Sequence, residues 1–204
     1  MIAPLLDLRL QALAYQGKPV LRDISFQLDR GDTLALVGPS GIGKSSLLRV
    51  IAGLNTDFDG RCGVRGTCAM VFQEPTLLPW RTVADNIALP TGASDQDVMA
   101  ALQDVGLKGR GADFPGQLSL GQQRRLSLAR AFAVKPDLLL MDEPFVSLDP
   151  DLVEEMMALF ARLREAHGVA TILVTHAEEE AKRLADRIVT LGGQPATIVS
   201  DMAP

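Results

Sequence analysis

One short segment constrains this chain more than any other, the sequence GPSGIGKS at residues 38–45. It fits the pattern G-x-x-x-x-G-K-[ST], follows the apolar run 33–37 and precedes residues 45–52, whose apolar side chains have helical spacing. Glycines let backbone N–H groups approach phosphate oxygens closely, and the N-terminus of a following helix favours an anion. The segment therefore predicts a nucleoside triphosphate site, in which Lys44 supplies a positive charge and Ser45 offers its hydroxyl to Mg²⁺.

The composition excludes several other classes of protein. Twenty Lys and Arg against 25 Asp and Glu give a net charge of −5, so the basic surface of a nucleic-acid-binding protein is not expected. The first residues include Asp7 and Arg9 and no basic leader, which argues against a secretory signal. No stretch approaches the ~20 apolar residues that a spanning helix needs, so any membrane role is predicted to be peripheral. Cys62 and Cys68 are predicted to be free thiols in a reducing cytosol.

Two adjacent acids, Asp142 and Glu143, follow an apolar strand predicted at residues 138–141. Burying neighbouring charges at a strand end costs free energy unless a cation or a proton transfer uses them. Asp142 is therefore a candidate Mg²⁺ ligand, and Glu143 is a candidate base that activates water. Two solvated acids in a turn are the alternative interpretation, which the presence of a phosphate loop disfavours.

Strands and helices are predicted to alternate along most of the chain. Alternating apolar residues at 24–28 are typical of a half-buried strand, and the apolar run 169–174 is typical of a strand buried on both faces. An amphipathic helix is predicted at 150–167, with Asp149 as its N-cap. A second helix is predicted after His176, with three glutamates in its first turn that complement the helix dipole.

Two segments have weaker patterns. Residues 81–117 are rich in Gly, Asp and Ala, with a modest helical pattern at 98–105, and are predicted to form a small helical insertion. The stretch from Cys62 to Cys68 is predicted to form a short hairpin. A metal site there would need further ligands that the neighbouring sequence lacks.

A capping-box pattern begins the helix predicted at 124–132, because Ser119 is followed three residues later by Gln122. The segment LSLGQ at 118–122, taken together with the phosphate loop and the acid pair, resembles the signature of the ATP-binding cassette (ABC) family. The resemblance covers nearly the whole chain, because the family's motifs stand in the family's order. These motifs are Tyr15, the phosphate loop, Gln73 in VFQEP, the signature, Asp142-Glu143-Pro144, Ser147-Leu148-Asp149, and His176.

The resemblance implies an α/β fold, a P-loop NTPase with a RecA-like parallel-sheet core, an N-terminal antiparallel β-subdomain and a small helical subdomain. It implies one ABC ATPase domain over residues 1–204, with the helical subdomain at approximately 77–132 inserted in the core. ABC cassettes work as head-to-tail dimers. The resemblance therefore implies a homodimer, or a heterodimer with a related cassette, in which each ATP lies between one subunit's phosphate loop and the other's signature.

The resemblance also implies a role for each motif residue. Tyr15 would stack on adenine, Glu143 would be the general base, His176 would contact the γ-phosphate, and Asp149 would cross the dimer interface. Gln73 would complete the Mg²⁺ shell and sense the transport partner. The implied ATP-binding residues are Tyr15, Gly38, Pro39, Ser40, Gly41, Ile42, Gly43, Lys44, Ser45 and Ser46; the implied Mg²⁺ ligands are Ser45, Gln73 and Asp142; the implied catalytic residues are Glu143, His176 and Lys44; and the implied signature contacts in trans are Ser119, Leu120, Gly121 and Gln122.

One residue departs from the family pattern. The usual signature has two adjacent glycines, and here the first of them is Leu120. A bulky side chain then stands where backbone approaches phosphate, so we expect weakened or slightly shifted contacts in trans, since Ser119 and Gly121 remain.

A single cassette without spanning helices resembles the ATPase subunit of a bacterial importer. Residues 77–87, which include Trp80, resemble the corresponding stretch in nitrate, sulfonate and taurine importers, although a core Trp is an equal alternative. The resemblance implies ATP and Mg²⁺ as cofactors, a separate membrane permease and, indirectly, a substrate-binding protein as partners, with no nucleic acid. It places the chain at the cytoplasmic face of the inner (plasma) membrane, bound peripherally. A soluble ABC ATPase of DNA repair or translation and a P-loop small-molecule kinase are the alternatives.

Overall fold

The computed structural model describes residues 3–204, which divide into two compact units. The first unit holds the described residues up to Met70, together with Asp137–Glu143 and Gly168–Pro204. The second holds Val71–Pro136 and Pro144–His167. Across residues 3–204 the helices are all too short or too polar to cross a membrane.

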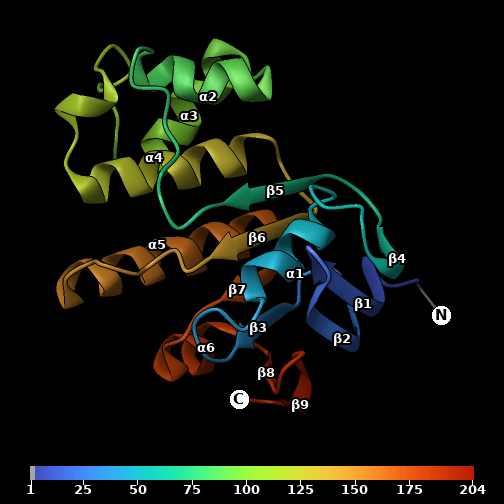
Figure 1. Ribbon diagram of the computed structural model, residues 1–204. Coiled ribbons are helices and arrows are strands. Elements are labelled where there is room, and N and C mark those ends of the chain that lie inside the picture. Colours follow the sequence, from blue (N-terminus) through green and yellow to red (C-terminus); the bar gives the residue numbers. More distant parts are fainter. Residues whose placement is uncertain (1–2) are drawn as a thin grey trace. The chain divides into compact units, whose positions relative to one another are not determined.

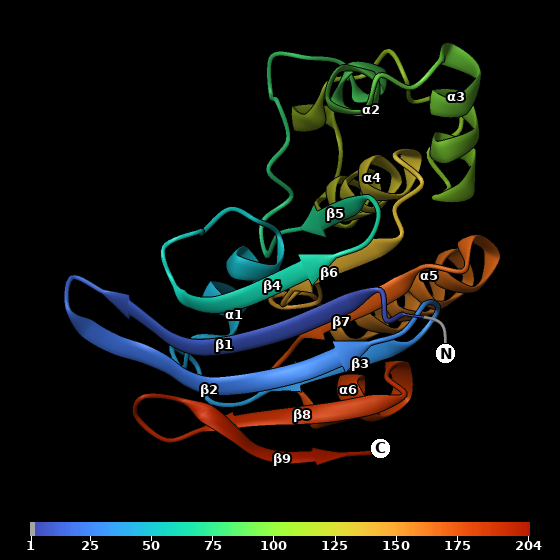
Figure 2. The ribbon, with the colours of Figure 1, turned by 90° about the vertical axis from the view of Figure 1, so that its right-hand side faces the viewer.

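An antiparallel sheet opens the first unit. Its strands are β1 (Leu6–Tyr15), β2 (Lys18–Leu28) and β4 (Asp59–Val64), in the order β2-β1-β4. Figure 2 shows the three strands side by side, with Leu8 of β1 opposite Phe26 of β2 and Cys62 of β4. Leu6, Leu8 and Leu10 are buried, because every second residue of a strand points to the same face. The predicted N-terminal antiparallel subdomain is therefore confirmed.

A six-stranded, mostly parallel sheet is the second sheet of the first unit. Strands β3 (Thr33–Val37), β7 (Ala170–Val174) and β6 (Leu138–Asp142) pair in parallel and are almost wholly buried. This burial explains their continuous apolar sequences, because a strand buried on both faces has no alternation of apolar and polar residues. The order is β5-β6-β7-β3-β8-β9, with β5 at Cys68–Val71, β8 at Arg187–Gly192 and β9 at Thr197–Met202.

Two short helices belong to the first unit. Helix α1 (Lys44–Ile51) buries Leu47 and Leu48 in the main hydrophobic cluster of this unit. Helix α6 (Glu178–Leu184) packs on β3 through Ala181, which lies against Ala35. Both helices follow a parallel strand of the sheet, as Figure 1 shows.

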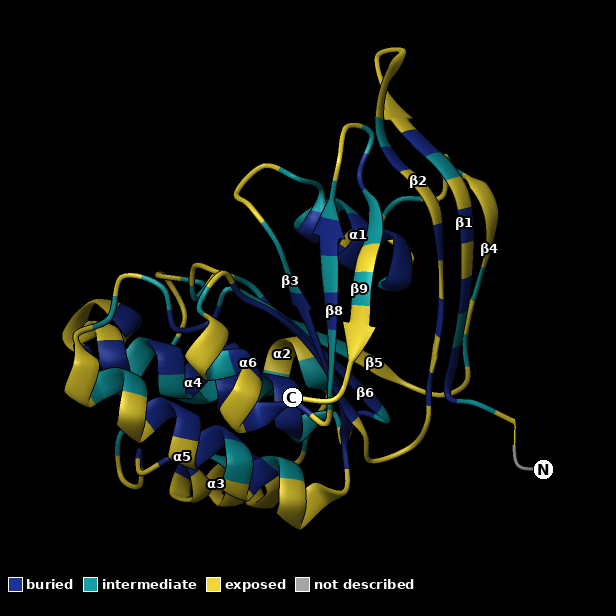
Figure 3. Cartoon of the chain, turned by 90° about the horizontal axis from the view of Figure 1, so that it is seen from below, coloured by how far each residue is buried: buried dark blue, intermediate teal, exposed yellow. Residues whose placement is uncertain are grey.

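The sequence pattern did not predict strand β9. It pairs antiparallel with β8 and forms the edge of the sheet. In Figure 3 the far end of β9 is exposed, whereas β8 is mostly half-buried or buried. Exposure of one side of this edge strand explains why its apolar pattern is weak in the sequence.

The prediction of a hairpin between Cys62 and Cys68 is wrong. Cys62 lies in β4 of the antiparallel sheet, whereas Cys68 begins β5 of the parallel sheet. The Asp137 carboxylate accepts from the Thr67 N–H at 2.8 Å and so holds the start of β5 beside β6. Both cysteines are free; Cys68 is exposed, and partial burial raises the pKa of the Cys62 thiol to about 11.

The second unit consists of helices. They are α2 (Val83–Thr91), α3 (Asp95–Asp104), the 3-10 turn η1 (Pro115–Gln117), α4 (Leu120–Ala133) and α5 (Pro150–His167). Figure 1 shows α2 and α3 beside α4, and these three helices contact one another. Fully buried Ile87, Leu126 and Phe160 contribute to the apolar interior of this unit. Helix α4 begins at Leu120, four residues earlier than predicted, because the capping box of Ser119 starts it there.

Candidate functional site

The phosphate loop joins β3 to α1 within the first unit. Gly38 and Gly43 have φ angles of 148° and 111°, which non-glycine residues rarely adopt. Gly43 is the N-cap of α1, so the free N–H groups of this helix open toward the loop. The loop backbone therefore has the geometry of an anion site.

Lys44 is the charged group of this loop. Its side chain is only 4% exposed, and its Nζ donates to the carbonyl oxygens of Gly38 at 2.8 Å and Pro39 at 3.0 Å. The same Nζ lies 3.8 Å from Glu143 Oε1. Burial with these oxygen partners holds one ammonium group between the phosphate loop and the end of β6.

Ser45 and Asp142 meet at the end of β6. The Ser45 hydroxyl donates to Asp142 Oδ1 at 3.0 Å. Burial raises the pKa of Asp142 and the Glu143 charge adds to this, whereas the Ser45 hydrogen bond lowers it. A hydroxyl and a carboxylate oxygen are ligands that Mg²⁺ prefers, and a cation would stabilise the buried charge.

Residues 3–204 contain no cluster of three or more His, Cys, Asp or Glu residues that could hold a metal by themselves. Mg²⁺ sites in nucleotide-binding proteins commonly use one or two protein oxygens together with substrate phosphates. The pair of Ser45 and Asp142 fits this second kind of site.

Glu143 lies between two other functional candidates. One carboxylate oxygen faces Lys44, and the other lies 3.3 Å from Nδ1 of His176, which follows β7. The Glu143 N–H donates to Val174 O at 2.9 Å, and its φ of 46° turns the chain sharply after β6. Parallel pairing of β6 with β7 brings these residues together, because the carboxyl ends of parallel strands share one edge of the sheet.

Tyr15 ends β1, and its side chain is 40% exposed. Its hydroxyl accepts a hydrogen bond from Asn55 Nδ2 at 3.0 Å. A hollow of about 920 Å³ lies beside the phosphate loop of the same unit. It is lined by Pro19, Val20, Pro39, Ser40, Gly41, Ile42, Gly193, Gln194, Pro195 and Ala196.

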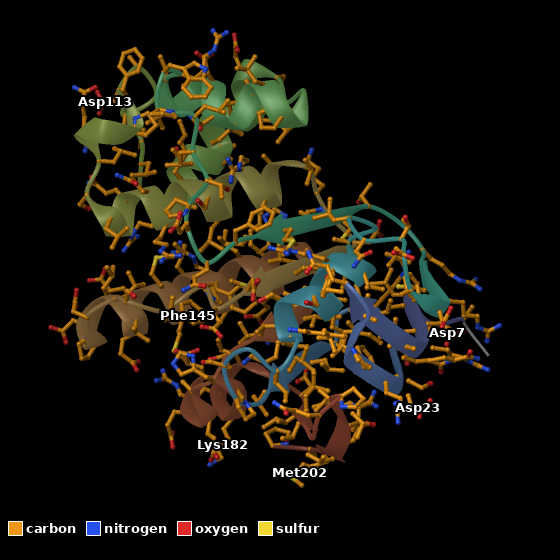
Figure 4. All side chains as sticks on the ribbon, viewed as in Figure 1. Asp7, Asp23, Asp113, Phe145, Lys182 and Met202 are labelled. Atoms are coloured by element: carbon orange, nitrogen blue, oxygen red, sulfur yellow. The ribbon has the colours of Figure 1, made fainter. Side chains whose placement is uncertain are left out.

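A second hollow of about 450 Å³ adjoins His176 on the first unit. Its walls include Gly38, Lys182 of α6 and Met202 of β9. Figure 4 labels Lys182 and Met202, which lie on these two elements near the C-terminal part of the chain. The phosphate loop therefore has a hollow along each of two borders.

The signature residues belong to the second unit. The Gln122 N–H donates to Ser119 Oγ at 3.3 Å, and the Ser119 N–H donates to Gln122 Oε1 at 3.0 Å, which completes the predicted capping box. A Cβ on Gly121 would lie 2.9 Å from Leu152 Cδ1, so this glycine lets α4 approach the start of α5. Leu120 is 47% exposed and contributes to the outer surface of the helix end.

Asp149 and Gln73 also lie in the second unit. Asp149 Oδ1 accepts from the Leu152 N–H at 3.0 Å, so it caps α5 as predicted. Gln73 is exposed in the loop after β5. The structure thus brings Lys44, Ser45, Asp142, Glu143 and His176 together in the first unit, and it brings the signature close to Asp149 in the second.

Sequence reasoning missed three residues near these motifs. The guanidinium group of Arg124 is buried in the second unit and donates to Val146 O at 3.3 Å, just before the Asp149 loop. Thr175 and Glu180 interact beside His176. Glu180 is one of three consecutive glutamates, and the helix dipole is sufficient to explain acids at all three positions. No sequence pattern distinguishes Arg124 from the other arginines of α4.

These features define the class of protein. A glycine-rich phosphate loop lies between strand β3 and helix α1, and an acid pair ends β6, which lies two positions from β3 in the sheet. This arrangement is typical of P-loop nucleotide-binding ATPases. Residues 21–146 match the model of the ABC transporter family, and the chain belongs to this family. It is an ATP-binding ATPase of this family, as the sequence analysis predicted.

Known relatives support the importer type. The chain is 40% identical over 206 residues to the aliphatic sulfonates import ATP-binding protein SsuB 2 of Burkholderia lata, covering 96% of this chain and 76% of the relative. It is also 40% identical to the SsuB 2 protein of Pseudomonas syringae pv. tomato, covering 97% and 86% of the two chains. The solved structure of cbiO1 from Clostridium perfringens, part of the ABC transporter complex cbiONQ, has the same fold. Its TM-score is 0.86 at 22% identity, and the match covers 98% of this chain and 89% of that one.

Proposed function

We propose that this chain hydrolyses Mg²⁺-ATP at the phosphate loop and thereby drives solute import through a separate membrane permease. The observation that carries the chemistry is the placement of Glu143, whose carboxylate faces Lys44 Nζ at 3.8 Å and His176 Nδ1 at 3.3 Å. A base held between two groups that contact the γ-phosphate is well placed to orient water for attack on that phosphate.

Each residue of the first unit has a distinct task in this proposal. Lys44 and the loop N–H groups hold the β- and γ-phosphates, and Tyr15 stacks on the adenine. Ser45 and Asp142 hold Mg²⁺, which neutralises phosphate charge when it is bound. His176 donates to the γ-phosphate while Glu143 takes the proton of the attacking water.

The signature residues of the second unit act in trans. The N-terminus of α4, with Ser119 and Gly121, is the end of a 14-residue helix and favours an anion. We propose that it contacts the γ-phosphate bound by another cassette, and that Asp149 crosses this interface. Gln73 completes the Mg²⁺ shell in the closed dimer. Closure then completes the site, which couples hydrolysis to movement of the permease.

The variant Glu143→Gln tests the general-base role and the dimer together. The amide cannot accept a proton at neutral pH, so we expect hydrolysis to fall about 100-fold or more while ATP still binds. The variant should then elute as a dimer in size-exclusion chromatography with Mg²⁺-ATP, and as a monomer without nucleotide.

The matched control is the double variant Glu143→Gln with Lys44→Ala, which should stay monomeric because phosphate binding is lost. Normal ATP hydrolysis by Glu143→Gln would contradict the role of the base. Loss of hydrolysis without any ATP-dependent dimer would leave the base in place and contradict the dimer.

For the solute, we propose an aliphatic sulfonate. The support is 40% identity over nearly the whole chain to proteins named as importers of that class. We also propose that the chain binds its permease at the cytoplasmic face of the membrane.

Deletion of the coding region should abolish growth of the source bacterium on an alkanesulfonate as sole sulfur source, but not on sulfate. Growth should return with the intact chain and not with Lys44→Ala; unchanged growth of the deletion strain on the sulfonate would contradict this solute.

A further inference from the structure

Three consecutive glutamates open α6, and their environments differ. Glu178 and Glu179 are exposed, and Glu178 pairs with Lys182 of the same helix at 3.3 Å. Glu180 is half-buried and points back toward the end of β7. The helix dipole accounts for acids at all three positions, but it does not account for the burial of one of them.

The Thr175 hydroxyl is the partner of Glu180. This threonine is 2% exposed, and its hydroxyl donates to the Glu180 carboxylate. The same hydroxyl oxygen accepts from the Ala177 N–H at 3.0 Å, while the Thr175 N–H donates to Leu36 O at 3.3 Å. The Thr175 side chain therefore links the backbone after His176 to α6, while the Thr175 backbone N–H binds the neighbouring strand β3.

Orientation of this hydroxyl depends on Glu180. A hydroxyl has a single proton, and a buried hydroxyl loses free energy when that proton has no acceptor. While the carboxylate accepts it, the oxygen's lone pairs remain directed at the Ala177 N–H. Without the carboxylate, the hydroxyl is free to rotate toward another acceptor, and the turn that carries His176 loses this anchor.

The electrostatic environment connects Glu180 to Glu143 as well. Burial raises the pKa of Glu180, the Thr175 hydrogen bond and His176 lower it, and the charge of Glu143 raises it again. The carboxylate of Glu180 therefore lies within the electric field of both His176 and Glu143.

We propose that Thr175 and Glu180 are positioning residues of the ATPase site, which hold the turn 175–177 so that His176 meets Glu143 and the γ-phosphate in one geometry. This inference rests on the proposed role of His176 in hydrolysis. In this proposal neither Thr175 nor Glu180 contacts the substrate, and both residues act only through His176.

Steady-state ATP hydrolysis by the full chain tests the proposal. Glu180→Ala and Thr175→Val should each lower kcat about tenfold, with less than a twofold change in the KM for ATP, because the phosphate loop is untouched. Glu180→Gln and Thr175→Ser should keep kcat within about threefold of the parent, because an amide oxygen still accepts and a serine still supplies the hydroxyl. Glu179→Gln is the matched control, since it removes an exposed charge from the same helix turn and should leave kcat unchanged.

A double-variant cycle separates positioning from a general structural role. In a His176→Ala background, Glu180→Ala should lower single-turnover hydrolysis no further, because the group that it positions is gone. An equal tenfold loss in both backgrounds, or unchanged kcat in Glu180→Ala, would overturn the proposal. If His176→Ala itself hydrolyses ATP normally, then the proposed role of His176 fails; if only Glu180→Ala is normal, then the positioning inference alone fails.

Discussion

Gly38 is the residue of the phosphate loop whose replacement has the most direct structural consequence. Its φ of 148° is open to glycine and strained for other residues. A Cβ at this position would lie 2.7 Å from Leu191 O, a backbone atom of β8 that cannot move alone. Glycine is therefore required here by the close packing of β8, in addition to its approach to phosphate.

Gly38→Ala should lower the free energy of unfolding by about 2–4 kcal/mol, the sum of backbone strain and overpacking, and should weaken ATP binding more than tenfold. Gly17→Ala is the matched control, because Gly17 has a φ of +76° but no neighbour within 4 Å of the added Cβ. It should lose only the backbone part, about 1 kcal/mol, and keep ATP affinity. Urea unfolding and nucleotide titration measure both effects, and equal losses in the two variants would contradict the packing argument.

Residue types at the site are mostly accessible to sequence reasoning, whereas their contacts are not. Lys44, Ser45, Asp142, Glu143 and His176 stand in or beside motifs whose chemistry is local. That Glu143 lies between Lys44 and His176 depends on the parallel pairing of both β6 and β3 with β7, which joins residues far apart in the chain.

At the scale of elements, the helix caps are the best-predicted feature. Ser119 with Gln122, and Asp149 at the start of α5, both make the cap hydrogen bonds that their spacing predicts. Helix α2 has an equivalent capping box formed by Thr82 and Asp85. A cap satisfies N–H groups of its own helix, so it depends on a few neighbouring residues only.

Ser119→Ala should lower the free energy of unfolding by about 1 kcal/mol, the usual cost of losing an N-cap. Thr82→Ala removes the same kind of cap from a helix of the same unit and should cost a similar amount. ATP hydrolysis should fall about tenfold or more in Ser119→Ala alone, because only that hydroxyl contacts phosphate in the proposed dimer. A parallel fall in both variants would show that cap stability, and not phosphate contact, determines the rate.

Strand pairing was harder to predict than the helices. Strands β4 and β5 are adjacent in sequence, yet they enter different sheets, because Asp137 binds Thr67 at the start of β5 and β1 pairs with β4. Backbone hydrogen bonds of a strand lie between segments distant in sequence, and residues 62–68 carry no signal of their partners.

At the scale of the whole molecule, two kinds of acid give stability opposite pH dependences. Burial raises the pKa of Asp142, so Asp142 holds its proton more tightly in the folded chain than in the unfolded chain. The free energy of unfolding therefore falls as pH rises above the ordinary Asp pKa. Two hydrogen bonds from Arg187, at 2.7 and 2.6 Å, lower the pKa of Asp201, so this pair stabilises the folded chain above the ordinary Asp pKa and the stabilisation is lost in acid.

We therefore expect Asp142→Asn to be more stable than the parent at pH 7 to 8, without nucleotide, and to converge with it as pH falls toward about 4, the ordinary Asp pKa. Arg187→Met should be less stable than the parent at pH 7, and this difference should shrink as pH falls below about 4. Urea unfolding from pH 3.5 to 8 measures both differences. If the stability difference of one variant stays constant over this pH range, the pKa shift assigned to the corresponding acid is contradicted.

Local sequence determined the phosphate loop, the acid pair, the helix caps and the buried strands, because each depends on residue types within one turn or one strand. These were sufficient to identify an ABC ATPase. The tertiary structure alone decided which sheet β4 and β5 join, that β9 completes the sheet edge, and that Glu180 accepts the hydroxyl of Thr175 next to His176. Such contacts form between segments whose chemistry is compatible with many partners, and only packing of the whole chain selects one.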